Sequence, residues 1–179
     1  LLVASPHLKD DVFRSSVIFV CTHDDRGALG LIVNRPLETV TFMELMVQLD
    51  VRGPTAHADK MIYFGGPIDV NRGFILHEPL EGMETSSETE ITSEISLSTS
   101  LSYFKRSDEA APTKNILVAV GYAGWSEGQL EEEIKAGDWL SIPTDSNFLF
   151  NTPPEHLWEK AYSKLEIEPY KMSDRIGHA

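Results

Sequence analysis

The joint between an apolar strand and an acidic helix lies at residues 121–131, with the sequence GYAGWSEGQLE. Its three glycines let backbones approach closely and adopt positive φ angles. The indole of Trp125 is too large to be left in water without a partner. We recognise no metal-ligand set and no phosphate-binding loop in this stretch. It therefore predicts a specific fold more clearly than it predicts a chemistry.

Apolar runs elsewhere in the chain predict a core made mainly of strands. Ser16–Thr22 and Asn115–Tyr122 are apolar on both alternating faces, which is typical of central strands covered on both sides. A short turn with Asp and Gly joins the first of these runs to Ala28–Asn34, which predicts a β-hairpin. Further short strands are expected at Met61–Phe64, Gly73–His77 and Trp139–Ile142.

Three capping-box patterns predict the starts of helices. They lie at Thr41–Glu44, Ser126–Gln129 and Thr152–Glu155, the last with proline at the first helical position. Another helix is expected over Ser98–Arg106. The acidic stretch 78–95 is expected to be a solvated loop or an edge strand.

Clustered strands with helices between them predict the α+β class, as a layered α/β sandwich forming a single compact domain over residues 1–179. The chain has 15 basic and 28 acidic residues and a net charge of −13. Such a surface repels nucleic acid and anionic lipid, so we expect neither direct nucleic-acid binding nor a membrane partner. The single cysteine cannot form an internal disulfide, which favours a cytoplasmic location.

Residues of reactive types give little support for catalysis. Cys21 and His23 share a face of one strand, but side chains at that spacing lie about 6.5–7 Å apart. We therefore favour an inert, buried Cys21, with a redox-sensing thiol as the alternative. The histidines have no dedicated metal-ligand spacing, so no metal and no cofactor is predicted.

Several polar or glycine-rich motifs stand at strand ends. Arg35, extended by the following proline, is interpreted as a structural ion pair, with an anchor for a carboxylate or phosphate as the alternative. The turn at residues 64–67 (FGGP) could turn its amides to an anion, although turn geometry alone accounts for it. Trp125 is either a lid over the core or a binding platform. The adjacent helix start slightly favours a groove for an anionic or peptide group.

The order of the motifs indicates a family. They are LLVASPHLKDDVF (1–13), the HDD and GALGLIVNRP motifs within 16–36, YFGGP (63–67), RGFILHE (72–78), GYAGWSEGQLEEEI (121–134), FNTPP (150–154) with Trp158, and GHA (177–179). Together they resemble the YqgE/AlgH family of bacterial proteins. This chain differs mildly in Ser126, where glycine commonly follows the tryptophan, and in Ile68, where valine is usual after GGP.

The resemblance implies a compact cytoplasmic α/β protein. Some members of that family are described as transcriptional regulators because of a genetic effect on exopolysaccharide production. No helix-turn-helix or ribbon motif is recognisable in the present sequence, so we expect any such regulation to be indirect.

Three functional hypotheses follow. The first is a non-enzymatic binding or regulatory protein with an unknown protein or small-molecule partner. Its candidate surface gathers residues from motifs at several strand ends, where α/β folds tend to bind ligands: Asn34, Arg35, Gly65, Gly66, His77, Trp125 and Gln129. The second is an enzyme with His77 or His23 as general base and Arg35 as anion clamp. The third is a regulator that binds DNA directly.

Overall fold

Strand β9 (Ile116–Ser126) is the centre of the fold because it bonds to other strands along both of its edges. The structure, a computed structural model, describes residues 1–48, 60–79, 88–99 and 115–166. Along one edge β9 pairs antiparallel with β6 (Ile68–His77). Along the other it pairs with β3 (Gly27–Ile32) and, in parallel, with β5 (Met61–Phe64).

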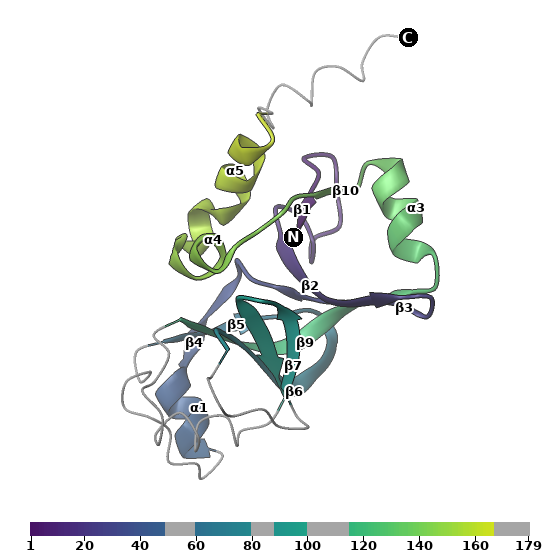
Figure 1. The fold of residues 1–179 in the computed structure, drawn as a ribbon. Helices are drawn as coiled ribbons and strands as arrows, with labels where there is room; N and C mark the ends of the chain where they lie inside the picture. The colour runs from purple at the N-terminus through teal and green to yellow at the C-terminus, as the bar shows by residue number, and fades with distance from the viewer. Residues whose placement is uncertain (49–59, 80–87, 100–114, 167–179) are drawn as a thin grey trace, which may run out of the picture.

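The described strands form one curled, largely antiparallel sheet (Figure 1). Its main path runs in the order β10 (Trp139–Ser141), β1 (Leu2–Ala4), β2 (Val17–Asp24), β3, β9, β6, β8 (Ile95–Ser98) and β7 (Glu88–Thr92). Off this path, β4 (Pro36–Thr41) pairs with β5. The α+β class is thereby confirmed, whereas the layered sandwich stays a prediction because the sheet curls.

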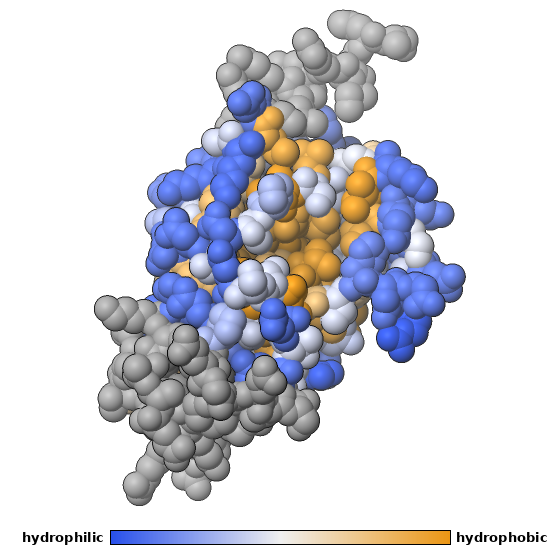
Figure 2. Space-filling view, in the orientation of Figure 1, coloured by the Kyte–Doolittle hydropathy of each residue, from blue (hydrophilic) through white to orange (hydrophobic). Residues whose placement is uncertain are grey.

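The two faces of the sheet carry separate hydrophobic clusters, as alternation along β2 requires. Phe19 packs on one face together with side chains of α4 (Ser146–Asn151) and α5 (Pro154–Lys164). Ile18 packs on the opposite face with Leu130 of α3 (Gln129–Ala136). In Figure 1, α3 and α5 stand on opposite sides of β1 and β10. Figure 2 shows apolar side chains between the polar outer sides of these two helices.

The strand predictions are largely confirmed. The β2–β3 hairpin forms, and its register shifts between Val20 and Thr22, which places Cys21 at an irregularity. Strand β9 continues through the glycine-rich segment to Ser126 instead of ending near Tyr122. The glycines allow this because the turn between β5 and β6 approaches closely there: a Cβ added at Gly121 would lie 2.3 Å from the Gly66 carbonyl oxygen.

The capping boxes have three different outcomes. The first is confirmed at α1 (Phe42–Gln48), since the Thr41 N–H donates to Glu44 Oε2 at 2.8 Å and the Glu44 N–H donates to Thr41 Oγ1 at 3.3 Å. The second is half formed: Gln129 Oε1 accepts from the Ser126 N–H at 3.1 Å, but α3 begins after Gly128. The third forms no cap, because the residue that precedes α5 is Pro153, which has no side-chain cap; the helix itself forms, and it begins with a proline, Pro154.

The remaining differences lie around residues 88–106 and 146–151. Strand β7 is an edge strand, one of the two forms expected for the acidic stretch. Ser98 belongs to β8, so the helix expected from that residue does not begin there, and 100–106 lie outside the described residues. Helix α4 was not predicted; its N-cap Asp145 accepts from the Phe148 N–H at 2.7 Å. In the described ranges, no helix is both long and apolar enough to cross a bilayer.

Candidate functional site

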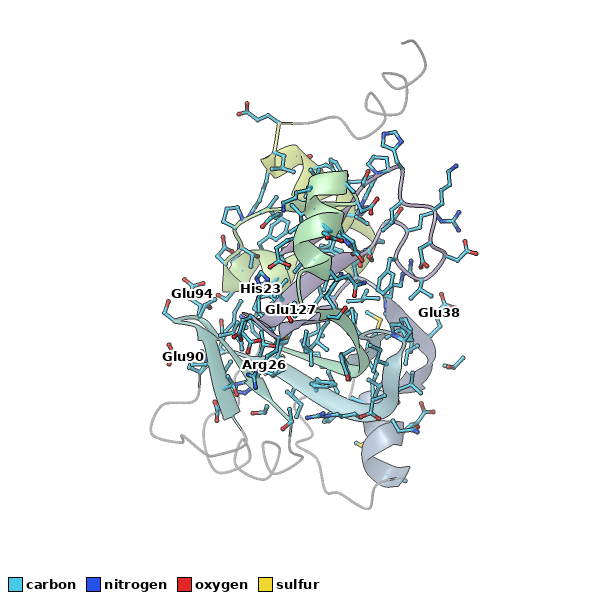
Figure 3. The ribbon with its side chains drawn as sticks, turned by 90° about the vertical axis from the view of Figure 1, so that its right-hand side faces the viewer. His23, Arg26, Glu38, Glu90, Glu94 and Glu127 are labelled. Carbon is cyan, nitrogen blue, oxygen red and sulfur yellow. The ribbon has the colours of Figure 1, made fainter. Side chains whose placement is uncertain are left out.

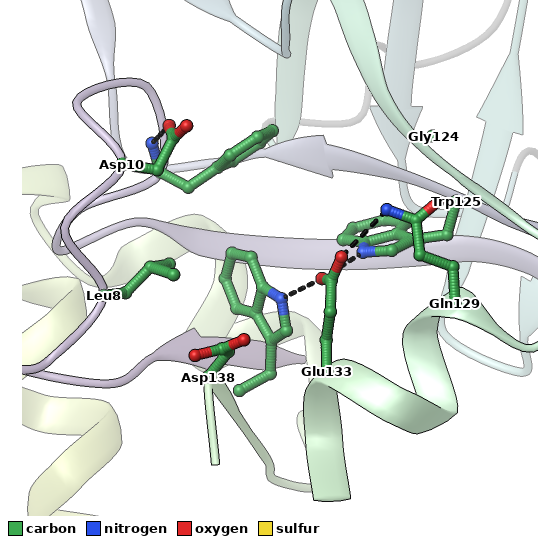
Figure 4. A pocket seen from close by; sticks show the side chains of 9 residues that line it. Leu8, Asp10, Gly124, Trp125, Gln129, Glu133 and Asp138 are labelled. Carbon is green, nitrogen blue, oxygen red and sulfur yellow. Dashed lines mark hydrogen bonds between the residues drawn. The ribbon is translucent and has the colours of Figure 1, made fainter. Parts of the chain in front are cut away.

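A pocket of about 290 Å³ lies between the loop that precedes β2 and helix α3 (Figure 4). The loop, β9, α3 and β10 all contribute to its wall. The lining residues are Leu8, Asp10, Phe13, Gly124, Trp125, Gln129, Glu133, Asp138 and Trp139. Trp125 and Gln129 come from the candidate surface expected from the sequence, and the other seven were not among its residues.

The Glu133 carboxylate orders the floor of the pocket by accepting three hydrogen bonds. Its Oε2 accepts from the indole N–H groups of Trp125 and Trp139, each at 2.8 Å. Its Oε1 accepts from Gln129 Nε2 at 2.8 Å. The indoles are 7% and 3% exposed, so each polar edge is satisfied by this one carboxylate. Figure 4 shows the three bonds converging on Glu133.

Three aromatic rings pack edge to face along the pocket. The Trp139 ring lies 5.9 Å from the Phe13 ring at an interplanar angle of 77°. It lies 6.0 Å from the Trp125 ring at 82°. Aromatic pairs prefer this geometry, and together with the bonds to Glu133 it fixes the rings in place.

The local sequence brings these groups together. Gly128, with a φ of 72°, turns the chain out of β9 into α3. Gln129 and Glu133 are four residues apart and therefore lie on one helix face. Gly137, with a φ of 83°, ends the helix. The chain then returns along β10, which places Trp139 beside Glu133.

Three carboxylates line the pocket. Asp10 Oδ1 accepts from the backbone N–H groups of Val12 at 2.8 Å and Phe13 at 3.1 Å, which holds the loop in a turn. Asp138 is half-buried, and its carboxylate makes no hydrogen bond or ion pair within the described ranges. Glu133 is the third. Across those ranges, no three His, Cys, Asp or Glu side chains gather closely enough to hold a metal ion.

A broader, shallow groove of about 690 Å³ adjoins the pocket and shares Gly124, Trp125 and Gln129 with it. Ile68, which is 41% exposed, contributes an apolar part of the groove. Arg26 also lines it and donates to Asp24 at 2.7 Å. That bond lowers the pKa of Asp24 below its ordinary value. Figure 3 shows His23 and Arg26 on the same side of the molecule as Glu127, the residue two positions before α3.

Asn34 and Arg35 hold the loop that precedes β2. The Asn34 side chain accepts from the Val17 N–H at 2.8 Å and donates to the Ser15 carbonyl at 2.9 Å. Arg35 donates to the Arg14 carbonyl at 2.7 Å. Burial, followed by repulsion from Arg14, lowers the pKa of Arg35. The expected ion pair is not formed within the described ranges, where carbonyl oxygens take the place of an acid.

Gly65 and Gly66 make close backbone contacts with neighbouring strands of the sheet. The Gly65 N–H donates to the Val120 carbonyl at 2.8 Å, and its own carbonyl accepts from the Ile32 N–H at 2.8 Å. Gly66 has a φ of 152°, and a Cβ there would lie 2.2 Å from the Tyr122 carbonyl carbon. The amide of Gly65 is therefore already used and does not face an anion.

Two of the three reactive candidates, His77 and Cys21, lie in the core. His77 is fully buried; its Nδ1 lies 2.8 Å from the Glu78 carbonyl oxygen and its Nε2 lies 2.9 Å from Ser98 Oγ. Burial raises the pKa of Cys21 to about 12. His23 does not contact that thiol but lies 2.7 Å from Glu131 Oε1 on α3.

Sequence reasoning thus found the tryptophan and glutamine of the pocket and missed its other residues. One local signal was available, since Glu133 follows Gln129 by one helical turn. The contributions of Leu8, Asp10 and Phe13 depend on tertiary packing of a loop more than a hundred residues away in sequence.

Comparisons of the sequence with known proteins find a family and close relatives. The AlgH-like family matches residues 1–170. A UPF0301 protein of Yersinia pseudotuberculosis serotype O:1b is 40% identical over 182 residues, covering 99% of this chain and 96% of the relative. A UPF0301 protein of Yersinia pestis is 39% identical over the same length and coverage.

Two solved structures are similar over most of the chain. The solution structure of the AlgH protein from Pseudomonas aeruginosa is 34% identical in sequence, with a TM-score of 0.76, and covers 99% of this chain and 93% of that one. The crystal structure of a protein from Corynebacterium diphtheriae has a TM-score of 0.74 at 19% identity, covering 91% and 84%. This second likeness shows the fold alone.

Proposed function

The chain belongs to the AlgH-like family, and we propose that it is a non-enzymatic binding protein of the bacterial cytoplasm. It acts through a protein or small-molecule partner that enters the pocket beside α3. Any effect on transcription passes through that partner, because a net charge of −13 opposes direct contact with DNA.

The observation that carries this proposal is the fixed geometry of the pocket. Glu133 holds Trp125 and Trp139 in one orientation, and Phe13 packs against the second of these rings. A site whose side chains are already ordered loses little conformational entropy when it binds. Apolar walls with a few placed polar groups are typical of ligand sites.

The positions of the reactive side chains favour binding over catalysis. Cys21 and His77 are buried, His23 is exposed and bonded to Glu131, and none of the three lines the pocket. The pocket wall instead carries aromatic rings, an amide and carboxylates.

The test is thermal unfolding of the full chain against a panel of compound classes. The panel contains organic amines, carboxylates, phosphorylated metabolites, nucleotides, divalent metals and duplex DNA. A ligand at 100 times its Kd should add about 2.7 kcal/mol to the free energy of unfolding. We expect a saturable shift with one small-molecule class. No shift with any class would contradict a small-molecule partner in this pocket. A shift with duplex DNA alone that persists at physiological salt would contradict the whole proposal.

A pair of loop variants locates the shift. Leu8 is half-buried and lines the pocket, so Leu8→Phe should fold and crowd the cavity. The control is His7→Phe, because His7 is exposed and does not line the pocket. The ligand-induced shift should be lost in the first variant and kept in the second.

A further inference from the structure

We infer that the pocket beside α3 binds an organic cation, an alkylammonium or guanidinium group the size of a lysine or arginine side chain. This inference rests on the proposed function and adds the chemical class of the ligand. Asp10, Glu133 and Asp138 line the pocket, and none of its nine lining residues is a lysine, arginine or histidine. The wall therefore carries only negative formal charge at neutral pH.

Acceptor atoms remain available for such a cation. The Asp138 carboxylate has no partner within the described ranges, although it is half-buried. Oε2 of Glu133 already accepts two bonds, whereas Oε1 accepts one from Gln129. A carboxylate oxygen has two lone pairs, so Oε1 keeps one free position. A donor with several N–H groups, such as an ammonium or a guanidinium, can use both carboxylates.

The aromatic part of the wall suits the same ligand. Tryptophan is the side chain with the strongest cation–π attraction. Trp125 and Trp139 both line the pocket, with Phe13 next to them. An alkyl chain on the cation would contact these rings and Leu8 while its charged end meets the carboxylates.

The start of α3 does not favour an anion here, contrary to the expectation from the sequence. The Ser126 N–H is already bonded to Gln129 Oε1, at 3.1 Å. Glu131 and Glu132 place two carboxylates in the first turn of the helix, where they offset its positive end. An incoming phosphate or carboxylate would meet these charges as well as those of the pocket.

Size and geometry narrow the ligand further. A volume of about 290 Å³ lies near the lower end for small-molecule pockets, which suits one side chain or a small amine. The carboxylates surround the cavity without gathering into a metal-binding group, as noted for the described ranges. An extended cation therefore fits better than a compact metal ion.

The experiment titrates the full chain with four probes of matched chain length, followed by tryptophan fluorescence and calorimetry. The probes are n-butylammonium, n-butylguanidinium, butan-1-ol and butyrate. We expect a cation to bind at least about tenfold more tightly than butan-1-ol, a difference of about 1.4 kcal/mol. Butyrate should bind more weakly still. Nα-acetyl-lysine N-methylamide and 1,4-diaminobutane then distinguish a protein side chain from a free amine, according to which binds more tightly.

Charge-matched variants test the carboxylates. Asp138→Asn keeps the shape of the side chain and should weaken cation binding at least about threefold, since it removes a nearby opposite charge. Asp25→Asn changes the net charge equally, but Asp25 is exposed and does not line the pocket, so the affinity should change less than about twofold. Asp10→Asn keeps the acceptor for the loop amides and serves as a second pocket variant.

The outcomes of these experiments separate the inferred ligand class from the proposed binding function. Equal or tighter binding of butan-1-ol or butyrate, or equal effects of Asp138→Asn and Asp25→Asn, would overturn the inference while leaving a binding site. Failure of every cation probe to bind would also overturn the inference. The proposed function would still stand if another class in the thermal panel gave a shift that Leu8→Phe abolishes. Its small-molecule form would fall with the inference if no class did.

Discussion

Trp125 and Trp139 donate their indole N–H groups to the same atom, Oε2 of Glu133, at 2.8 Å each. One tryptophan lies on β9 and the other on β10, so a side chain of α3 joins two strands that are not neighbours in the sheet. The same bonds fix the aromatic wall of the pocket. The stability of the fold and the shape of the pocket therefore depend on one carboxylate.

Replacing Glu133 should be far more costly than replacing its neighbour. Glu133→Ala leaves two largely buried indole N–H groups without their acceptor, and we expect it to lower the free energy of unfolding by about 2–3 kcal/mol. Glu132→Ala, at an exposed position, should change it by less than about 0.5 kcal/mol. Urea unfolding measures both. Similar values for the two variants would show that the shared carboxylate does not hold the strands.

The fold requires a glycine at position 66, in the turn between β5 and β6. Gly66→Ala combines a φ of 152° with a Cβ placed 2.2 Å from Tyr122 backbone, so we expect a loss of more than about 3 kcal/mol or failure to fold. Gly73→Ala on the neighbouring strand has open space around its Cβ and should change stability by less than about 1 kcal/mol. Chemical unfolding of the two proteins is the measurement. A mild effect of Gly66→Ala would contradict the close approach of β9.

The thiol of Cys21 should be unreactive in the folded protein. It is 5% exposed, and burial raises its pKa to about 12, so almost no thiolate is present at pH 8. We expect alkylation by iodoacetamide to be at least about a hundredfold slower than in the urea-unfolded chain. Rapid labelling of the native protein at pH 8 would restore the redox-sensing alternative.

The same thiol predicts the direction of an alkaline effect. A folded-state pKa raised from 9.0 to about 12 means that the unfolded state loses the proton more easily. Cys21 therefore contributes stability that is fully present below pH 9 and lost as the pH rises through about 12. Cys21→Val, which removes the ionisable group, should make the free energy of unfolding less dependent on pH between these values. An unchanged alkaline profile would show that the thiol is not the cause.

At acidic pH, the His23–Glu131 contact should report on the link between the β2–β3 hairpin and α3. The N–H of Glu131 itself, followed by His23, lowers the pKa of Glu131 below 4.5. A lowered folded-state pKa contributes stability above 4.5 that is lost as the pH falls through the folded value. His23→Gln should raise the Glu131 pKa toward 4.5 without reaching it, as measured by carboxyl-carbon NMR titration. His7→Gln is the control and should leave it unchanged.

Much of the fold could be predicted from local patterns. The β2–β3 hairpin follows from two apolar runs around an Asp- and Gly-containing turn, and the first capping box formed as expected. Helix α4 escaped prediction because its signal is one N-cap residue, Asp145, before a six-residue helix. The extension of β9 was missed because glycine in a strand normally weakens it, and only close neighbours make it necessary.

The site was harder to predict than the fold, for a physical reason. Motifs at strand ends suggested that Arg35 and His77 would face a common cleft with Trp125. In the structure, a backbone carbonyl oxygen accepts a hydrogen bond from the Arg35 guanidinium. The His77 ring is buried, with its two nitrogens next to the Glu78 carbonyl oxygen and Ser98 Oγ. The Trp125 indole is held in the pocket by its hydrogen bond to Glu133, and a loop distant in sequence completes the wall. Contacts of this kind depend on tertiary packing, which spacing along one chain does not encode.

The most direct test of the binding pocket is an NMR titration that follows the three tryptophan indole N–H signals as n-butylammonium is added. Trp158 is an internal reference, since its indole donates to the Ala4 carbonyl at 2.8 Å on the side of the sheet that α5 covers. We predict that the Trp125 and Trp139 signals shift together, saturably and with one Kd, while the Trp158 signal stays in place. Equal shifts of all three signals, or none, would contradict the pocket beside α3 as the binding site for this cation.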